Sequence, residues 1–168
     1  MNGIVSQEME VNVPASQAWE VYGSLLLSQA AKKGLTEKGK SGFQKAEILE
    51  GNGGVGTILR YFFVPGNASW FPSFKERYVT VDNEKRVKEK EMIEGGFLDL
   101  GFSLYRMRFE VIEKSEDRCI TRYTVEYEVQ EADDDQVAAM VAGSTMVLLT
   151  VLEAANNYLI NNKNCNDK

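Results

Sequence analysis

Apolar and polar residues alternate along most of this chain, and the period of the alternation divides it into elements. Residues 5–13 alternate with a period of two, which predicts a strand that ends at Pro14. From Pro14 the apolar positions take helical spacing, which predicts a helix that reaches Leu26. Residues 28–42 are rich in Lys and Gly and predict at most a short second helix that ends near Gly34.

Three pairs of strand-like segments follow, and a short turn joins the members of each pair. Neighbouring strands joined in this way form hairpins, so the pattern predicts an antiparallel sheet. The first turn, Gly51-Asn52-Gly53-Gly54, contains glycines that permit positive φ. The predicted segments are residues 46–50 with 55–64, 74–81 with 86–94, and 97–113 with 119–130.

After Glu131 the apolar residues recur at three- and four-residue steps, which predicts one long amphipathic helix with an acidic start near Asp133. The order of the elements predicts an α+β fold in which a curved antiparallel sheet closes around this C-terminal helix. We expect a single domain over residues 1–160 and a polar tail over residues 161–168. The helix stripe expected to floor a cavity is Val137, Met140, Val141, Ser144, Leu148, Leu149 and Leu152.

Composition narrows the function. The net charge of −6, from 19 basic against 25 acidic residues, argues against nucleic acid and an anionic membrane surface as partners. No segment is expected to span a membrane, and the N-terminus does not read as a signal peptide, so a cytoplasmic location is expected. Histidine is absent, and Cys119 and Cys165 show no metal-ligand spacing, so we expect neither a metal nor a cofactor.

The strongest candidate for a site lies in the predicted strand that contains Phe74, Glu76 and Tyr78. These three side chains share one face, because residues two apart on a strand point the same way. If that face is the apolar one, Glu76 is buried, and Lys88 on the next strand is a candidate partner. The alternative is a surface glutamate in an exposed ladder of charges, and periodicity alone does not decide between them.

Large apolar residues occupy both strand phases between Phe97 and Phe109. The pattern suggests that one face lines a core or a cavity and that the other meets a partner or a loop. Core filling is one interpretation of the aromatic residues. A pocket for an aromatic ligand around the polar pair is the other.

Three stretches of the chain resemble one group of plant proteins: residues 50–57 (EGNGGVGT), 81–86 (VDNEKR) and 92–101 (MIEGGFLDLG). The chain resembles the plant pathogenesis-related class 10 proteins of the Bet v 1 superfamily over nearly its whole length. The resemblance implies the helix-grip fold, in which the sheet and the long C-terminal helix enclose a large apolar cavity.

Within that superfamily, residues 8–11, 64–66, 75–77 and 96–101 are most similar to norcoclaurine synthases and norbelladine synthases. Those enzymes condense an arylethylamine with an aromatic aldehyde, so the resemblance implies a Pictet-Spengler-type condensing enzyme of plant alkaloid biosynthesis. In the norcoclaurine synthase pattern a Tyr, a Glu, a Lys and an Asp line the cavity. Glu76 and Lys88 match the Glu and the Lys. Phe74 stands where the Tyr is expected and Met107 where the Asp is expected, and neither can replace the lost polar group.

Glu76 and Lys88 are therefore the predicted catalytic residues. We expect the carboxylate to move protons and the ammonium to hold an aldehyde or phenolate oxygen. The predicted substrate-binding residues are Phe74, Tyr78, Phe97, Tyr105, Met107, Met140 and Ser144. The expected ligand is a small aromatic amine, an aldehyde or an alkaloid, and a homodimer is left open. The alternatives are a non-catalytic carrier of hydrophobic plant metabolites and a cyclase or isomerase that acts on a bound alkaloid.

Overall fold

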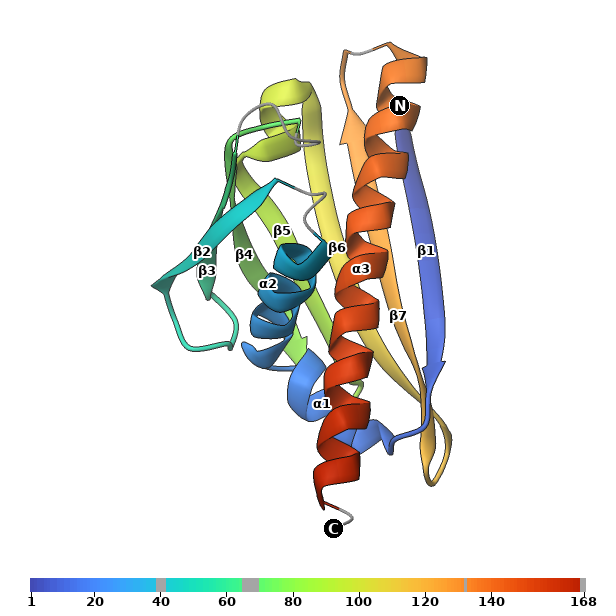
Figure 1. Cartoon of the computed structure of the whole chain (residues 1–168). Coiled ribbons are helices and arrows are strands. Elements are labelled where there is room, and N and C mark those ends of the chain that lie inside the picture. Colours follow the sequence, from blue (N-terminus) through green and yellow to red (C-terminus); the bar gives the residue numbers. More distant parts are fainter. Residues whose placement is uncertain (39–41, 65–69, 132, 167–168) are drawn as a thin grey trace.

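The computed structural model describes residues 1–38, 42–64, 70–131 and 133–166. Within this part of the chain, seven strands form one curved antiparallel sheet in the order β1-β7-β6-β5-β4-β3-β2, and the long helix α3 lies against one of its faces (Figure 1). The strands are β1 Asn2–Val11, β2 Phe43–Glu50, β3 Ile58–Phe63, β4 Ser73–Asp82, β5 Val87–Gly95, β6 Phe102–Ser115 and β7 Arg118–Val129. The helices are α1 Ala15–Tyr22, α2 Leu26–Lys38 and α3 Asp134–Asn166, with a 3-10 helix, η1, over Gly96–Leu100. The predicted α+β class is confirmed.

The three predicted hairpins are present as the antiparallel pairs β2 with β3, β4 with β5, and β6 with β7. In the first of them, Gly51, Gly53 and Gly56 have positive φ, a conformation in which a side chain would be strained. The first strand returns to the far edge of the sheet, where Val11 lies opposite Cys119 of β7. The sheet is therefore built from strands that are neighbours in the sequence, and one long-range pairing adds β1 at the edge next to β7.

The front of the chain holds two helices, with a break that the sequence pattern did not show. Helix α1 ends before Gly23, and Ser24 Oγ then accepts the backbone N–H of Leu26 at 3.2 Å at the start of α2. The predicted end of the second helix near Gly34 is wrong, because α2 continues past this residue. A Cβ on Gly34 would lie 2.6 Å from the Cβ of Ala154, so the glycine serves the close packing of α2 on α3.

The strand predicted from Phe97 begins only at Phe102, because η1 precedes it. Glycines with positive φ surround this turn: Gly95, Gly96 and Gly101. A shift in the pairing of β6 with β7 between Phe102 and Leu104 then lets both Phe102 and Tyr105 be buried. The apolar residues in both phases thus reflect a helical turn and a bulge in the chain, and no second apolar face of a strand is needed to explain them.

Helix α3 begins where the acidic residues predicted it. Asp133 Oδ1 accepts the backbone N–H groups of Asp135 at 2.9 Å and Gln136 at 3.2 Å, which caps the helix. The helix runs to Asn166 and so extends into the polar tail expected after residue 160. Buried polar contacts fix its position, since Tyr22 of α1 donates to Asn156 Oδ1 at 2.8 Å.

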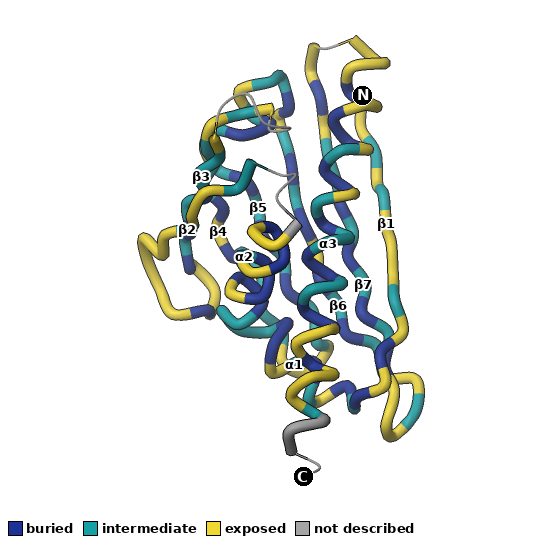
Figure 2. The backbone as a smooth tube through the Cα atoms, in the orientation of Figure 1, coloured by how far each residue is buried: buried dark blue, intermediate teal, exposed yellow. Residues whose placement is uncertain are grey.

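Helix α3 is also long and apolar enough to cross a membrane, since within Asp134–Lys163 an 18-residue window has a mean hydropathy of 1.8. On length and composition the expectation that no segment approaches a membrane span is wrong. The apolar residues of α3 also form part of the core, because Leu152, Ala155 and Leu159 are buried against the sheet. Buried stretches of β5, β6 and β7 lie behind α2 and α3 (Figure 2). A single helix of this kind is weak evidence for a membrane protein.

Candidate active site

A cavity of about 150 Å³ lies between α2, α3 and the inner face of the sheet. Most of its wall is aliphatic or aromatic. The hydroxyl-bearing and charged side chains that line it are Tyr61, Glu76, Lys90, Tyr105 and Ser144. A few polar groups in an apolar cavity are the usual makeup of a small-molecule site.

Six of the nine predicted site residues line this cavity: Phe74, Glu76, Phe97, Tyr105, Met107 and Ser144. Three others, Tyr78, Lys88 and Met140, are buried in the structure but do not belong to the cavity lining. The geometry thus gathers most of the predicted set around one space. That these residues bind or convert a substrate stays a prediction.

Glu76 faces the interior, as the shared strand phase with Phe74 and Tyr78 predicted, and only 2% of its surface is exposed. Its Oε1 accepts hydrogen bonds from Lys90 Nζ at 3.1 Å and from the Tyr61 hydroxyl at 3.0 Å. No hydrogen bond to Oε2 is found among the residues that the structure describes. Glu76 lines the cavity, and its Oε2 can still accept a hydrogen bond.

The predicted pairing of Glu76 with Lys88 is wrong. Lys88 Nζ instead donates to the backbone carbonyl of Ser24 at 2.8 Å and lies 4.3 Å from the centre of the Tyr78 ring. The strand register explains the difference, because Glu76 lies opposite Met92, two residues from Lys90 but four from Lys88. Lysines two apart on β5 both point inward, and the nearer one reaches the carboxylate.

The two buried lysines have opposite pKa shifts. Burial, with the neighbouring charge of Lys90, lowers the pKa of Lys88 to about 6, although the Glu76 carboxylate opposes this. Burial alone would also lower the pKa of Lys90, but the adjacent Glu76 carboxylate outweighs it and the pKa of Lys90 is raised. At neutral pH, Lys90 is therefore the charged lysine beside Glu76, and Lys88 is mostly a neutral amine.

Tyr61 and Lys90 are the residues that the sequence reasoning missed. Phe74 has no hydroxyl, but Tyr61 stacks against it with ring centres 4.9 Å apart and brings a phenol to Glu76 from the neighbouring strand. Burial and the Glu76 charge raise the pKa of Tyr61, so it stays a phenol at neutral pH. The strand pattern contained a signal for both residues. Tyr61 lies two residues from Leu59 on β3, and Lys90 lies two residues from Met92 on β5, so each shares a strand face with a buried apolar residue.

Small residues of α3 border the cavity, as the sequence predicted. Gly143 and Ser144 both line it, and a Cβ on Gly143 would lie 3.4 Å from Trp70 Nε1. Ser144 Oγ donates back to the carbonyl of Val141 at 2.9 Å. Burial raises the pKa of Tyr105, while hydrogen bonding to Ser144 opposes the rise. These residues leave room in the cavity that a leucine would fill.

Among the described residues that line the cavity, none is a cysteine or a histidine. Within the described ranges, no three carboxylate or thiol side chains gather in a way that could hold a metal ion. Cys119 is buried, and burial raises the pKa of its thiol to about 11. The chemistry available in the cavity is that of a carboxylate, an ammonium and phenols.

A curved sheet that packs around a long helix and encloses a largely aromatic cavity, with the buried Glu76–Lys90 pair in the cavity wall, defines a helix-grip protein. Residues 1–161 match the pathogenesis-related protein Bet v 1 family, and the chain belongs to this family. The fold expected from the sequence resemblance is confirmed.

The chain is similar to characterised enzymes of this family. Norbelladine synthase from Narcissus pseudonarcissus is 40% identical over 166 residues, which cover 98% of this chain and 97% of that protein. S-norcoclaurine synthase 2 from Papaver somniferum is 35% identical over 167 residues, which cover 95% of this chain and 68% of that protein. A crystal structure of norcoclaurine synthase from Thalictrum flavum in complex with dopamine and hydroxybenzaldehyde superposes with a TM-score of 0.76 at 33% identity, over 96% of this chain and 88% of that one.

Proposed function

We propose that this protein is a Pictet-Spengler-type condensing enzyme of alkaloid biosynthesis, which joins a small aromatic amine to an aldehyde inside the cavity. The observation that carries the proposal is the buried Glu76–Lys90 pair, which lies in the wall of an otherwise aromatic cavity. Two findings support it: the identity of 40% to norbelladine synthase, and the similarity to a norcoclaurine synthase that binds dopamine and hydroxybenzaldehyde. A cytoplasmic location stays a prediction, and the oligomeric state stays open.

The chemistry needs a group that moves protons and a positive charge near the aldehyde oxygen. The amine adds to the aldehyde carbon to give a carbinolamine, whose C–O bond then breaks to release water and leave an iminium ion. In the cyclising reaction the aromatic ring attacks the iminium carbon, and Glu76 takes the proton that the ring carbon loses. The Lys90 ammonium stabilises negative charge on the oxygen as the carbinolamine forms.

This proposal assigns to Lys90 the role that was predicted for Lys88. Lys90 lines the cavity and is charged beside Glu76, whereas Lys88 is turned to the carbonyl of Ser24 and is mostly neutral. The aromatic side chains give the substrate ring surfaces to stack on, since Phe97 lies 4.7 Å from Tyr105 and 5.0 Å from Phe71 between ring centres.

The test is turnover of arylethylamines with a panel of aldehydes, with the condensed product and its chirality measured. Glu76→Gln should lower kcat by about 10²–10⁴-fold, the usual worth of a general acid-base group. Glu89→Gln is the matched control, because Glu89 lies on the same sheet but pairs with Arg108 away from the cavity. A Glu76→Gln protein with the wild-type rate would reject this mechanism.

A carrier of apolar aromatic metabolites is the second candidate, because Phe74 and Met107 stand where the norcoclaurine synthase pattern has ionisable groups. Tight ligand binding without turnover by the wild type, and unchanged affinity in Glu76→Gln, would favour carriage. The variant Phe74→Tyr with Met107→Asp restores the two polar groups, and we expect it to increase cyclised product if the cavity is an active site. A cyclase or isomerase would instead convert a bound alkaloid when no aldehyde is present.

A further inference from the structure

The hydroxyl of Tyr61 reaches Glu76 from a neighbouring strand and is held there without a ligand. Tyr61 is buried on β3 and donates to Glu76 Oε1 at 3.0 Å. Its ring stacks on Phe74 with an interplanar angle of 17°. The stacking fixes the direction of the phenol, so the hydrogen bond does not depend on bound substrate.

Two further hydroxyls, those of Ser28 and Tyr78, lie near the Tyr61 hydroxyl. Ser28 Oγ lies 3.4 Å from the Tyr61 hydroxyl and 3.2 Å from the Tyr78 hydroxyl. The Tyr61 hydroxyl is placed as a donor toward Ser28 Oγ as well, but it has one proton, and its shorter bond is the one to the Glu76 carboxylate. In the contact between Ser28 and Tyr78 either hydroxyl can be the donor. Ser28 and Tyr78 thus surround the Tyr61 hydroxyl with polar groups on the side away from Glu76.

Lys90 binds the same carboxylate oxygen as Tyr61. Both donors occupy Oε1, and Oε2 has no partner among the described residues. The titratable groups that face Glu76 are Tyr61 on β3, Lys88 and Lys90 on β5, and Tyr78 on its own strand, while β6 presents the uncharged Met107. One oxygen is anchored and the other is presented to the cavity.

We propose that Tyr61 is a positioning residue for the condensation, which anchors Glu76 Oε1 so that Oε2 meets the proton of the bound substrate. The proposal rests on the proposed function, because it assigns a base to a reaction in this cavity. A base held in one orientation removes a proton faster than one that must first be ordered. Tyr61 therefore acts through Glu76 and need not touch the substrate itself.

The test compares Tyr61→Phe with Tyr123→Phe. The first variant keeps the ring that stacks on Phe74 and removes the hydroxyl. The second removes a buried tyrosine hydroxyl that donates to the Thr145 carbonyl at 2.8 Å and does not line the cavity. It thus controls for the loss of one buried hydrogen bond.

We expect Tyr61→Phe to lower kcat by roughly ten- to a hundredfold with little change in KM, as for a lost hydrogen bond to a charged group. Tyr123→Phe should keep the wild-type kcat and KM. A Tyr61→Phe protein with wild-type values, or a Tyr123→Phe protein that changes as much, would overturn the proposal.

A second measurement separates this proposal from the proposed function. The carbon-13 NMR signal of the Glu76 carboxyl can be measured in the unliganded protein at neutral pH, with the signal assigned by its loss in Glu76→Gln. If no amine and aldehyde react with the wild type, the proposed function fails on that result alone. A change in the chemical shift of this carboxyl in Tyr61→Phe, but not in Tyr123→Phe, still supports the anchoring of Oε1, and an unchanged signal overturns it.

Discussion

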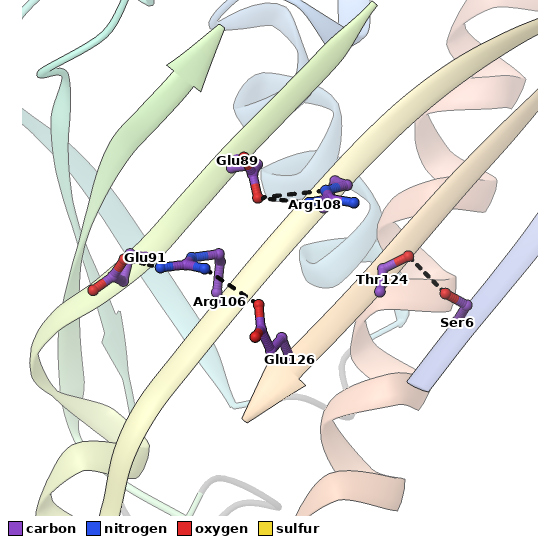
Figure 3. Close-up of polar contacts among 7 residues, drawn as sticks. All are labelled: Ser6, Glu89, Glu91, Arg106, Arg108, Thr124 and Glu126. Carbon is purple, nitrogen blue, oxygen red and sulfur yellow. Dashed lines mark hydrogen bonds and ion pairs between the residues drawn. The ribbon is translucent and has the colours of Figure 1, made fainter. Parts of the chain in front are cut away.

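Strand β5 presents lysines to the inside of the sheet and glutamates to the outside, and the two faces handle charge differently. Inside, Lys88 and Lys90 are 0% and 5% exposed. Outside, Glu89 and Glu91 pair with arginines of β6 at 3.2 Å and 3.1 Å (Figure 3). The alternation of one strand thus produces a solvated ladder of ion pairs on one face and a dry cluster on the other.

The difference between the faces lies in the water around each charge. The outer pairs remain partly exposed, so water still reaches their charges, and Arg106 is shared between Glu91 and Glu126. The inner pair of Glu76 and Lys90 has lost its water, and each charge depends on the other. Strongly perturbed ionisable groups collect on the inner face, where the cavity is.

The largest effect should follow from breaking the inner pair. Lys90→Met should lower the free energy of unfolding by about 3–5 kcal/mol, because it leaves the Glu76 carboxylate buried with one donor fewer. Urea unfolding at neutral pH measures it. The double variant Glu76→Leu with Lys90→Met should regain most of the loss, since no charge is then left alone. A double variant as unstable as the single one would show that packing matters here more than charge.

Lys88 should produce the next largest effect, and its sign depends on pH. Its folded pKa of about 6 lies below that of an unfolded lysine, so between these values the unfolded chain binds more protons and stability rises with pH. Between about pH 6.5 and 9, the wild-type free energy of unfolding should gain up to about 1.4 kcal/mol per pH unit relative to Lys88→Met. Urea unfolding of both proteins at three pH values in this window gives the slope.

A wild-type stability that runs parallel to that of Lys88→Met across this window would mean that Lys88 is charged in the folded protein. In that case the inner face would hold two cations against one carboxylate. Lys88→Met also leaves the Ser24 carbonyl without its donor, which lowers stability by an amount that does not depend on pH. The change with pH in the stability difference between the two proteins therefore reports the titration of Lys88, and the part of the difference that does not depend on pH reports the lost hydrogen bond.

The comparison of the two faces also shows where sequence reasoning was sufficient. Period-two patterning predicted the strands and the shared face of Phe74, Glu76 and Tyr78, and the structure shows that this face is the inner one. The alternating charges of β5 did not reveal that Lys88 and Lys90 are buried, because the same pattern is typical of an exposed strand. Burial on that strand is decided by what α2 and α3 cover.

The register between neighbouring strands was the second feature that the sequence pattern could not predict. Glu76 pairs with Lys90 because it lies opposite Met92, whereas Lys88 lies farther along the hairpin, opposite Val81. No spacing along the sequence fixes this register. Likewise, the role of Gly34 depends on Ala154, which lies on another helix and far away in the chain.

Substitutions on α3 should have a moderate effect, and the effect should depend on whether the residue lines the cavity. Ser144→Leu should fill part of the cavity and weaken binding of an aromatic amine by roughly tenfold or more, with a destabilisation of about 1–3 kcal/mol at most. Met146→Leu is the matched control, because Met146 is 63% exposed and lies outside the cavity lining. Calorimetric titration with the same amine measures both. Equal affinities in the two variants would place the ligand elsewhere.

The smallest effect should come from the outer face. Arg108→Gln removes the partner of Glu89 but leaves both positions in contact with water, so the free energy of unfolding should fall by only about 0.2–1 kcal/mol. The loss should shrink further in concentrated salt, which screens exposed charges, whereas the loss in Lys90→Met should persist because salt does not reach the buried pair. Urea unfolding of both variants at low and high salt makes the comparison direct. If Arg108→Gln were as costly as Lys90→Met, or as insensitive to salt, hydration would not be what distinguishes the two faces of β5.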